Sequence, residues 1–313
     1  MKRMPAIECL DLMKRFEDLI AVDHISFEIQ QNEIFGLLGP NGAGKTTTTR
    51  MLTTVLPPTE GTAIVAGYDI IKEAKEVRKM IDVVSQRVAL DIFLSVFDNF
   101  DIYGRIQGIP KKERKSKIDQ LLNDFGLADK KRTKVELLSG GLMRRLQVAR
   151  AFMCDHEILF LDEPTQGLDP QAKRKVWDFI QDFSRHDKKT IIITTHDMTE
   201  ADYLCDRIGI IDHGKIIALE SPKALKGRIG RDVIEIRLEG NAGSLKSKIS
   251  TIDYVKTVRD TNDGLRVEVV DGDSIMSDLI QYITAKGGII RNVSVHKPTL
   301  EDVFIDLTGR RLR

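Results

Sequence analysis

A glycine-rich stretch near the N-terminus reads Gly39-Pro40-Asn41-Gly42-Ala43-Gly44-Lys45-Thr46 and matches the pattern G-x-x-x-x-G-K-[S/T]. It follows an apolar segment, 33–38, with the character of a short strand. Residues 45–56 contain no internal Gly or Pro and stop before Pro57-Pro58, which ends a helix. The sequence therefore predicts a strand, a tight loop and a helix in succession.

The residue types of this loop suit the binding of phosphate groups. Glycines let backbone N–H groups curl around phosphate oxygens, and the start of the following helix adds a partial positive charge. Lys45 can reach the β- and γ-phosphates, and the Thr46 hydroxyl can bind Mg²⁺. We therefore expect residues 39–46, together with Thr47, to bind ATP with Mg²⁺.

Two carboxylates, Asp162 and Glu163, follow an apolar run at 158–161. In a parallel sheet the end of such a strand lies at the ligand-binding edge. Asp162 then suits Mg²⁺, bound through water, and Glu163 could orient or deprotonate the water that attacks the γ-phosphate. Taken alone, a strand that ends in Asp-Glu is common and usually means only that the strand meets solvent. The phosphate loop is what favours the catalytic interpretation.

A second candidate anion site reads Leu138-Ser139-Gly140-Gly141 and opens the last of three helices expected between 94 and 153. A serine hydroxyl and free N–H groups at a helix start can bind a phosphate oxygen. By itself the same stretch could be an ordinary helix cap after a turn. It indicates nucleotide binding only in combination with the phosphate loop.

Together these motifs resemble the nucleotide-binding subunit of ATP-binding cassette (ABC) transporters over residues 5–220. The resemblance rests on the order of the motifs along the chain, which is Phe16, the phosphate loop, Gln86, 138–141, Asp162-Glu163, Gly167-Leu168-Asp169 and His196. Ser85, Leu142 and Gln166 depart from the residues that are frequent at these positions in the family. Neither the departure at Ser85 nor the one at Leu142 removes a phosphate ligand.

The resemblance implies roles for residues whose type alone decides little. Phe16 would stack on the adenine ring, where an aromatic face is all that is needed; without the family it could equally be a core residue. Gln86 would touch Mg²⁺ and the attacking water, and His196 would contact the γ-phosphate. Asp169 would lie at the contact with a second subunit.

The family further implies a head-to-tail dimer that encloses two ATP molecules. Ser139, Gly140 and Gly141 of one copy would then close over the nucleotide held by the phosphate loop of the other. The residues alone leave a second arrangement open, because the helix from Gly141 and the strand that ends at Asp162 could fold back on each other within one chain.

The composition excludes few functions. Of the 313 residues, 42% are hydrophobic and 30% are charged, as in ordinary globular proteins, and the 48 basic and 47 acidic residues give a net charge of +1. This balance gives no reason to expect a nucleic acid partner. Cys9, Cys154 and Cys205 lack the close spacing of metal or redox motifs, and we interpret them as small apolar residues.

Neither a signal peptide nor a membrane-spanning segment is expected. Residues 6–15 include charged side chains where a signal peptide has an apolar core, and no run approaches the roughly 18 apolar residues of a membrane-spanning helix. If the protein works at a membrane, we expect it to be a peripheral subunit recruited to the cytoplasmic face by a separate permease.

The pattern of elements predicts an α/β protein with two domains. Residues 1–220 read as a P-loop ATPase domain with a β-rich N-terminal part and a helical insertion at about 94–153. A linker is expected at 221–231, followed by a C-terminal accessory domain at 232–313. Its order of strand, helix, strand, strand, helix and strand is ferredoxin-like, an α+β arrangement.

Two further stretches indicate which ABC ATPase the chain resembles. The tail, which includes Pro298-Thr299-Leu300-Glu301-Asp302-Val303-Phe304, looks like that of ATPases from drug-resistance and antibiotic-export systems. The family also implies that residues near 87–104 receive a short helix of the permease. We therefore expect ATP-driven export of a drug, antibiotic or lipid-like compound whose identity the sequence does not give.

The alternative is a soluble ABC ATPase that acts on ribosomes or DNA without a permease. Relatives of that kind usually fuse two cassettes or insert long coiled coils, whereas this chain has one cassette and no heptad run. A neighbouring gene for a six-span hydrophobic protein would favour transport.

Overall fold

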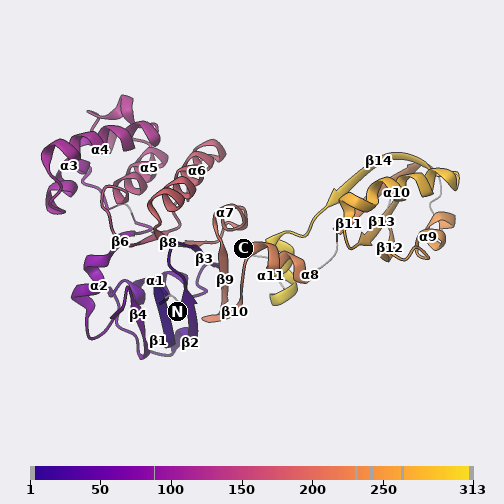
Figure 1. Ribbon diagram of the computed structural model, residues 1–313, viewed down its shortest axis with the longest axis horizontal. Coiled ribbons are helices and arrows are strands. Elements are labelled where there is room, and N and C mark those ends of the chain that lie inside the picture. The colour runs from indigo at the N-terminus through magenta and orange to yellow at the C-terminus, as the bar shows by residue number, and fades with distance from the viewer. Residues whose placement is uncertain (1–3, 88, 230–231, 240–242, 262–263, 310–313) are drawn as a thin grey trace. The chain divides into compact units, whose positions relative to one another are not determined.

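The computed structural model describes residues 4–87, 89–229, 232–239, 243–261 and 264–309. Contacts divide the chain into two compact units at Pro222–Lys223. The larger unit holds the first 222 residues, and the smaller one holds most of the remainder. The ribbon of Figure 1 shows both, and each is described here by itself.

An antiparallel sheet with the order β2-β1-β4-β5 forms the β-rich start of the larger unit. Its strands are β1 (Ile7–Phe16), β2 (Leu19–Ile29), β4 (Glu60–Val65) and β5 (Tyr68–Asp69). Strands β1 and β2 form a hairpin that closes at the pair Phe16–Leu19. Alternate side chains of β1 and β2, such as Ile7, Ile25 and Ile29, are buried, which is the pattern of a sheet covered on one face.

A six-stranded sheet with the order β10-β9-β3-β8-β7-β6 forms the centre of this unit. Its strands are β3 (Ile34–Leu38), β6 (Ile81–Val84), β7 (Ile158–Asp162), β8 (Thr190–Thr195), β9 (Arg207–Asp212) and β10 (Lys215–Glu220). All of them pair in parallel except β10, which is antiparallel to β9. Every residue of β3, β7 and β8 is buried, as expected for strands covered on both faces.

Along the chain, the helices of this unit fall into two groups. Helices α1 (Lys45–Leu52), α2 (Ala74–Met80), α6 (Pro170–Asp187) and α7 (Met198–Leu204) follow strands or precede them. The helical insertion consists of α3 (Val96–Ile106), α4 (Lys111–Asp124) and α5 (Gly140–Ala151), with short 3₁₀ turns at Ala128–Lys130 and Val135–Leu137. Residues 94–153 are all described and contain no strand, as the sequence predicts.

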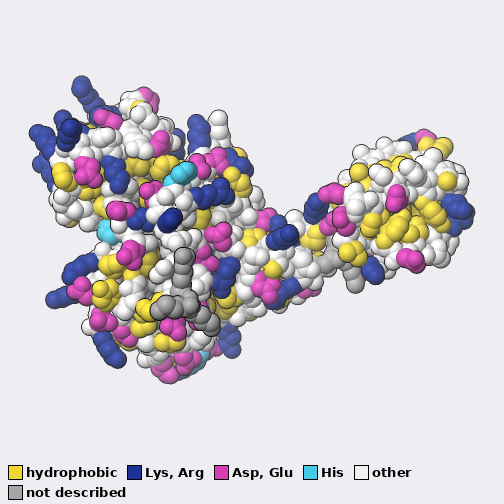
Figure 2. Space-filling view, in the orientation of Figure 1, with side chains coloured by type: hydrophobic (Ala, Val, Ile, Leu, Met, Phe, Trp, Pro, Cys, Tyr) yellow, Lys and Arg dark blue, Asp and Glu magenta, His cyan; other side chains and the backbone are white. Residues whose placement is uncertain are grey.

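Helices α3 and α4 of the insertion are joined by a buried ion pair. The Nε atom of Arg114 lies 2.6 Å from Oδ1 of Asp101, and the two side chains are only 7% and 10% exposed. The outer face of α4 carries exposed basic residues, and Figure 2 shows Lys and Arg side chains gathered in this region. The insertion therefore has a basic surface and a charged contact inside.

The smaller unit contains an antiparallel sheet with the order β12-β13-β11-β14. Its elements are α8 (Pro222–Ile229), β11 (Asp232–Glu239), α9 (Gly243–Ile249), β12 (Val255–Thr261), β13 (Gly264–Val269), α10 (Gly272–Ala285), β14 (Ile289–His296) and α11 (Leu300–Thr308). The apolar sides of the strands and of α9 and α10 form one core. This strand order and element order confirm the predicted ferredoxin-like topology.

Two expectations about helices differ from the structure. The segment 221–231, interpreted as a linker, contains helix α8, which begins at Pro222 because proline is accommodated in the first turn of a helix. The helix expected over 45–56 ends at Leu52, where the Thr53 hydroxyl donates to the Thr49 carbonyl and Thr54 adopts a φ of 59°. In the described part of the chain, no helix has the length and apolarity to cross a bilayer.

Candidate functional site

The predicted phosphate loop lines a pocket at the carboxyl ends of the parallel strands. The residues that line the pocket are Phe16, Leu19, Ala21, Asn41, Gly42, Gly44, Lys45, Thr46, Thr47, Gln86 and Glu163. They come from the β1–β2 hairpin, the loop between β3 and α1, the segment after β6, and the end of β7. The fold thus gathers residues that the sequence singled out from distant motifs. Phe16 is 42% exposed, so its ring is not part of the core.

Two glycines of the loop are required by close packing. A Cβ atom on Gly44 would lie 2.5 Å from the carbonyl oxygen of Ala21, and Gly44 has a φ of 110°, which side chains disfavour. A Cβ atom on Gly39 would lie 2.2 Å from the carbonyl oxygen of Ile211. The loop therefore sits directly on the backbone of β2 and β9, which fixes where its N–H groups point. The sequence did not predict that Leu19 and Ala21 of β2 line the pocket.

The side chain of Lys45 is buried within the phosphate loop. Its Nζ atom donates to the carbonyl oxygens of Gly39 at 2.7 Å and Pro40 at 2.9 Å. Burial lowers the pKa of Lys45, and the nearby charges of Glu163 and Asp162 act in the opposite direction. The ammonium is thus held at the centre of the loop, on the side where the two carboxylates lie.

Asp162 and Thr46 present a set of oxygen atoms at the end of β7. The Thr46 hydroxyl lies 3.4 Å from both carboxylate oxygens of Asp162, and the Thr194 hydroxyl also donates to Asp162. Hydroxyl, carboxylate and amide oxygens are the ligands that Mg²⁺ prefers. Gln86 is exposed at the same pocket, where its Nε2 atom donates to Oε1 of Gln166 at 3.2 Å. These donors fit a magnesium ion bound partly through water.

Glu163 has an unusual backbone and an unusual side-chain environment. Its φ of 49° lies in the left-handed region, which a non-glycine residue adopts at some energetic cost. Its Oε1 atom lies 2.9 Å from Nδ1 of His196, and its Oε2 atom is buried without a hydrogen-bond partner among the described residues. His196 can therefore orient the carboxylate, and Oε2 is the oxygen that remains available to a water molecule.

A buried side chain that the sequence analysis did not identify, Arg144 of α5, holds the backbone around Glu163. Its guanidinium donates to the carbonyl oxygens of Asp162, Glu163 and Pro164, and to that of Ser85. The pKa of Arg144 is lowered by burial, against the charges of Asp162, Glu163 and Glu200. The planar fork of donors explains how one residue can join the end of β7 to the segment that carries Gln86.

Gln147, one turn further along α5, completes this network. Its Oε1 atom accepts from Arg144 at 3.0 Å, and its Nε2 atom donates to the carbonyl oxygens of Ser85 at 2.9 Å and Arg87 at 2.8 Å. Helix α5 is therefore linked to both segments that flank the pocket. Nothing in the sequence distinguishes Arg144 from an ordinary arginine on a helix, so its role in this network could not be predicted.

The second predicted anion site lies at the start of α5 but away from this pocket. Ser139 caps the helix and accepts from the backbone N–H of Leu142 at 3.4 Å, and both Ser139 and Gly140 are exposed. Of the described residues that line the pocket, none comes from 139–141. Asp169 is likewise exposed and caps α6 through the backbone N–H of Ala172 at 2.9 Å. Ser139, Gly140 and Asp169 are therefore exposed on the surface of the larger unit, and Gly141 is half-buried.

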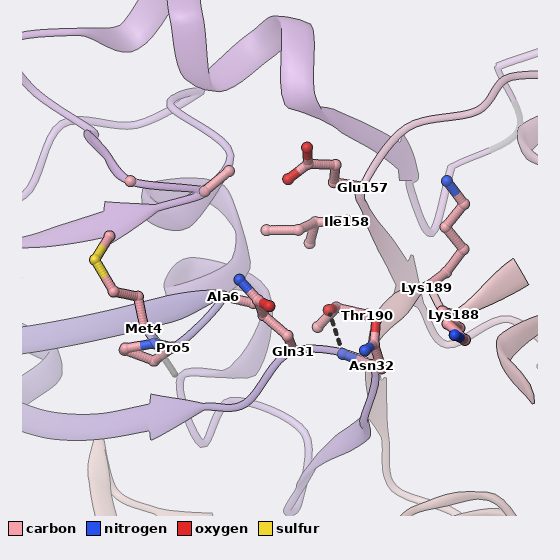
Figure 3. Close-up of a pocket in the computed structure, with 12 residues that line it drawn as sticks. Met4, Pro5, Ala6, Gln31, Asn32, Glu157, Ile158, Lys188, Lys189 and Thr190 are labelled. Carbon is pink, nitrogen blue, oxygen red and sulfur yellow. Dashed lines mark hydrogen bonds between the residues drawn. The ribbon is translucent and has the colours of Figure 1, made fainter. Parts of the chain in front are cut away.

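A different hollow lies at the opposite, amino-terminal ends of the same strands (Figure 3). Asn32 precedes β3, Ile158 begins β7 and Thr190 begins β8, and the backbone N–H of Asn32 donates to the Thr190 hydroxyl at 3.0 Å. None of the residues singled out by the sequence lines this hollow among those described. The candidate nucleotide chemistry is confined to the carboxyl ends of the strands, as is usual in parallel sheets.

Comparison with protein families gives two matches that divide the chain in the same way as its contacts. Residues 22–166 match the family model described as ABC transporter. Residues 221–308 match the model described as ATP-binding protein DrrA1-3-like, C-terminal domain.

Curated relatives match along nearly the whole chain. A daunorubicin resistance ATP-binding protein, DrrA3 of Streptomyces coeruleorubidus, is 36% identical over 95% of this chain and 93% of its own length. The linearmycin resistance ATP-binding protein LnrL of Bacillus subtilis is 33% identical over 98% of this chain and 99% of its own length. The Nod factor export ATP-binding protein I of Sinorhizobium fredii is 39% identical over 98% of this chain and 87% of its own length.

Solved structures agree with the fold of the larger unit. The structure of cbiO1 from Clostridium perfringens, part of the ABC transporter complex cbiONQ, superposes with a TM-score of 0.64 and 26% identity, covering 71% of this chain and 91% of that one. A further structure, titled as the ATP-binding subunit of an ABC transporter, gives a TM-score of 0.66 at 22% identity and covers 72% of this chain and 93% of that one.

Proposed function

Because this chain belongs to the ATP-binding subunits of ABC transporters, we propose that its ATPase activity drives the export of a drug, antibiotic or lipid-like compound through a separate permease. The observation that carries the direction of transport is the match of both units, including residues 221–308, to relatives named for drug resistance or export. A cassette match alone would leave import and export equally open.

The proposed ATP site uses the pocket formed by the phosphate loop. The backbone N–H groups of residues 41–46 and the Lys45 ammonium would bind the phosphates, with Gly39 and Pro40 shaping the loop and Thr47 beside them. The exposed ring of Phe16 would stack on the adenine. Thr46, Asp162 and Gln86 would hold Mg²⁺, which neutralises charge on the β- and γ-phosphates. The donor set at the end of β7 supports this assignment.

Hydrolysis is proposed to depend on Glu163 and on the residues that position it. The unpartnered Oε2 atom would accept a proton from the attacking water, or orient that water toward the γ-phosphate. His196 would hold Oε1 and contact the γ-phosphate, while Arg144 fixes the backbone from behind. In ATP hydrolysis the water oxygen forms a bond to the γ-phosphorus, the bond to the β-phosphate oxygen breaks, and ADP and phosphate leave.

A second copy of the chain is proposed to complete each ATP site. The open N–H groups at the start of α5 and the exposed Ser139 hydroxyl form an anion-binding helix terminus that no residue of the phosphate loop occupies in the same chain. In a head-to-tail dimer, Ser139, Gly140 and Gly141 would close over the γ-phosphate in the other copy's loop. Asp169 would contact the partner beside that site.

The permease is proposed to bind the segment 87–104. Val96 and Phe100 of this segment are buried and pack inside the insertion, but Ile92 and Phe93 are 43% and 69% exposed. Exposed apolar residues next to the Gln86 segment suit a short amphipathic helix of a partner. The protein would then be peripheral, held at the cytoplasmic face of the membrane by that contact.

The test is transport in membrane vesicles that contain this chain and a candidate permease from the same genome. We expect ATP-dependent accumulation of a fluorescent anthracycline in inverted vesicles, with vesicles that carry Glu163→Gln as the matched control. Retention of ATPase activity without transport of anthracyclines, polyenes or lipid analogues would contradict the proposed export function. Copurification with ribosomes instead of the permease would favour the soluble alternative.

A further inference from the structure

Three side chains of metal-binding type meet at the amino-terminal edge of the central sheet. Asp82 is the second residue of β6, and Cys154 and His156 lie in the connection between α5 and β7. Because Ile81 of β6 pairs with Ile158 of β7 in a parallel register, the two segments enter the sheet side by side. One ligand atom from each of Asp82, Cys154 and His156 lies within 4.8 Å of the others.

A thiol, an imidazole and a carboxylate are the ligands that zinc prefers in proteins. We propose that Asp82, Cys154 and His156 bind one Zn²⁺ ion, with water in the fourth tetrahedral position. The site lies at the end of the strands opposite to the phosphate loop, so it is separate from the proposed magnesium ligands Thr46, Gln86 and Asp162. It also gives Cys154 a role other than the apolar one that its spacing in the sequence indicated.

The environment of His156 gives independent support. Its Nδ1 atom is buried and has no hydrogen-bond partner among the described residues. The nearest carboxylate oxygen, Oδ2 of Asp82, is 3.9 Å away, which is too far for a hydrogen bond. Leaving a buried nitrogen unpaired is unfavourable, and a metal ion between Nδ1 and the carboxylate would give that nitrogen a partner.

The surrounding groups match those that usually support a zinc site. The Tyr103 hydroxyl of α3 donates to Oδ2 of Asp82, which orients the carboxylate. The guanidinium of Arg150 lies 4.9 Å from the centre of the Tyr103 ring. The positive charges of Arg150 and Lys117 act on Asp82 and Cys154. The carboxylate of Asp82 and a thiolate at Cys154 would balance the two positive charges of Zn²⁺.

Zinc binding at this site must displace a proton. Burial, aided by the charge of Asp82, raises the pKa of the Cys154 thiol to about 11. The free thiol is therefore protonated at neutral pH, and Zn²⁺ binds the thiolate.

A bound ion would connect three parts of the larger unit. It would join β6 to the α5–β7 connection directly, and through Tyr103 it would restrain α3 of the insertion. Strand β6 leads into the segment that carries Gln86. The inference stands independently of the transported substrate, because it concerns the other end of the strands.

The experiment uses the full chain after treatment with a chelator, in a large excess of Mg²⁺ so that hard oxygen sites are occupied. We expect calorimetry to show one Zn²⁺ per chain and the thermal midpoint to rise with Zn²⁺. Co²⁺ should replace Zn²⁺ and give the intense near-ultraviolet absorption of a cobalt–thiolate bond. Cys154→Ser should abolish that band, although Cys9 and Cys205 are still present, and should lower the affinity at least about 100-fold.

Further variants separate ligand binding from a general effect on folding. His156→Asn should weaken Zn²⁺ binding as Cys154→Ser does, and Tyr103→Phe should weaken it by about tenfold. His186→Asn, at an exposed position of α6, is the matched control and should bind as the unaltered chain does. Retained ATPase activity verifies that each variant is folded. Absence of Zn²⁺ binding in the unaltered chain, or binding unchanged in both Cys154→Ser and His156→Asn, would overturn the proposal.

Discussion

Arg144 and Glu163 show how much of the site depends on single buried residues. Glu163 is only 6% exposed, and its backbone is held in the left-handed region while Arg144 binds its carbonyl oxygen at 2.8 Å. Glu163 would act on the attacking water, and Arg144 holds the backbone of Glu163 in place. Replacing either residue should therefore lower the rate of ATP hydrolysis more than it lowers the affinity for ATP.

Replacing Glu163 by Gln should remove the group that accepts the proton of the attacking water. We expect the rate of ATP hydrolysis to fall by about 10²- to 10⁴-fold, the usual contribution of a general base. ATP affinity should be retained, because the loop and Lys45 are unchanged; single-turnover hydrolysis and equilibrium binding measure the two quantities. Glu157→Gln, at an exposed position before β7, is the control. Unchanged hydrolysis in Glu163→Gln would rule out the proposed mechanism.

Replacing Arg144 by Lys keeps the charge but removes the planar fork that contacts several carbonyl groups. We expect kcat to fall by about 10- to 100-fold, because displacement of Glu163 by a fraction of an ångström misplaces the water. The KM for ATP should change little, and a parallel rise in KM would indicate a general structural role instead. Arg145→Lys is the matched control, since the guanidinium of Arg145 donates to the Phe125 carbonyl outside the site.

The sequence predicted the residues whose type is tied to their chemistry, such as Lys45, Thr46 and the acidic pair after β7. It could not predict Arg144, because an arginine in a helix is ordinarily exposed, and only the approach of α5 to the end of β7 buries it. Leu19 and Ala21 were missed for a similar reason. Their place at the pocket depends on the hairpin register and not on their type.

At the scale of elements, the insertion is held together by the ion pair between α3 and α4. Burial raises the pKa of Asp101, but hydrogen bonds from Arg114 and Arg105 outweigh it, so the net pKa is below the ordinary value of 3.8. A carboxyl group with a lowered pKa stabilises the fold above its unfolded pKa, and this stabilisation is lost as the pH falls through the folded value.

Replacing Asp101 by Asn should leave Arg114 as a buried charge without its partner. We expect a loss of about 3–5 kcal/mol in the free energy of unfolding of the part that contains the insertion, at about pH 7. The difference from the unaltered chain should narrow as the pH falls below 3.8, where Asp101 itself becomes protonated. Urea denaturation at several pH values measures both effects. Asp129→Asn, which breaks an exposed pair, should change stability by no more than about 1 kcal/mol.

The elements predicted best were those with a strong apolar pattern and clear ends. Strand β7 covers the apolar run expected at 158–161 and ends at Asp162, because it is a buried run next to charged residues. The residue pattern predicted no helix or strand in the region of α2, β4, β5 and β6. Strand β5 has only 2 residues and β6 only 4, so their pairing partners, and not their own patterns, define them.

At the scale of the whole molecule, an ATP site shared between two copies can be tested by mixing two inactive variants of the chain. Lys45→Ala should disable the phosphate loop, and Gly141→Asp should place a negative charge at the helix start that is proposed to close over the nucleotide of the other copy. If each site uses the loop of one copy and α5 of the other, a mixed dimer contains one intact site. A site within one chain would contain a defect in every copy.

We therefore expect the equal mixture to recover about a quarter of the unaltered ATPase activity, since half the dimers are mixed and each has one intact site of two. Each variant alone should be inactive. The measurement is steady-state phosphate release after the chains have been allowed to exchange, with each variant at the same total concentration as the control. No recovery, with mixed dimers verified by differently tagged chains, would exclude the arrangement in which copies share a site.

Strand β6 is an edge strand of the central sheet, which makes the protein more prone to aggregate. An edge strand exposes unpaired backbone groups that can recruit another chain, and a largely parallel sheet assembles slowly enough to leave that edge open for a time. The charge of Asp82 interrupts what would otherwise be a run of Ile81, Val83 and Val84. We expect Asp82→Val to lower the soluble fraction on refolding in the presence of a chelator, measured by sedimentation, while Asp82→Asn lowers it less. One carboxylate on a four-residue strand would thus act as a gatekeeper against aggregation.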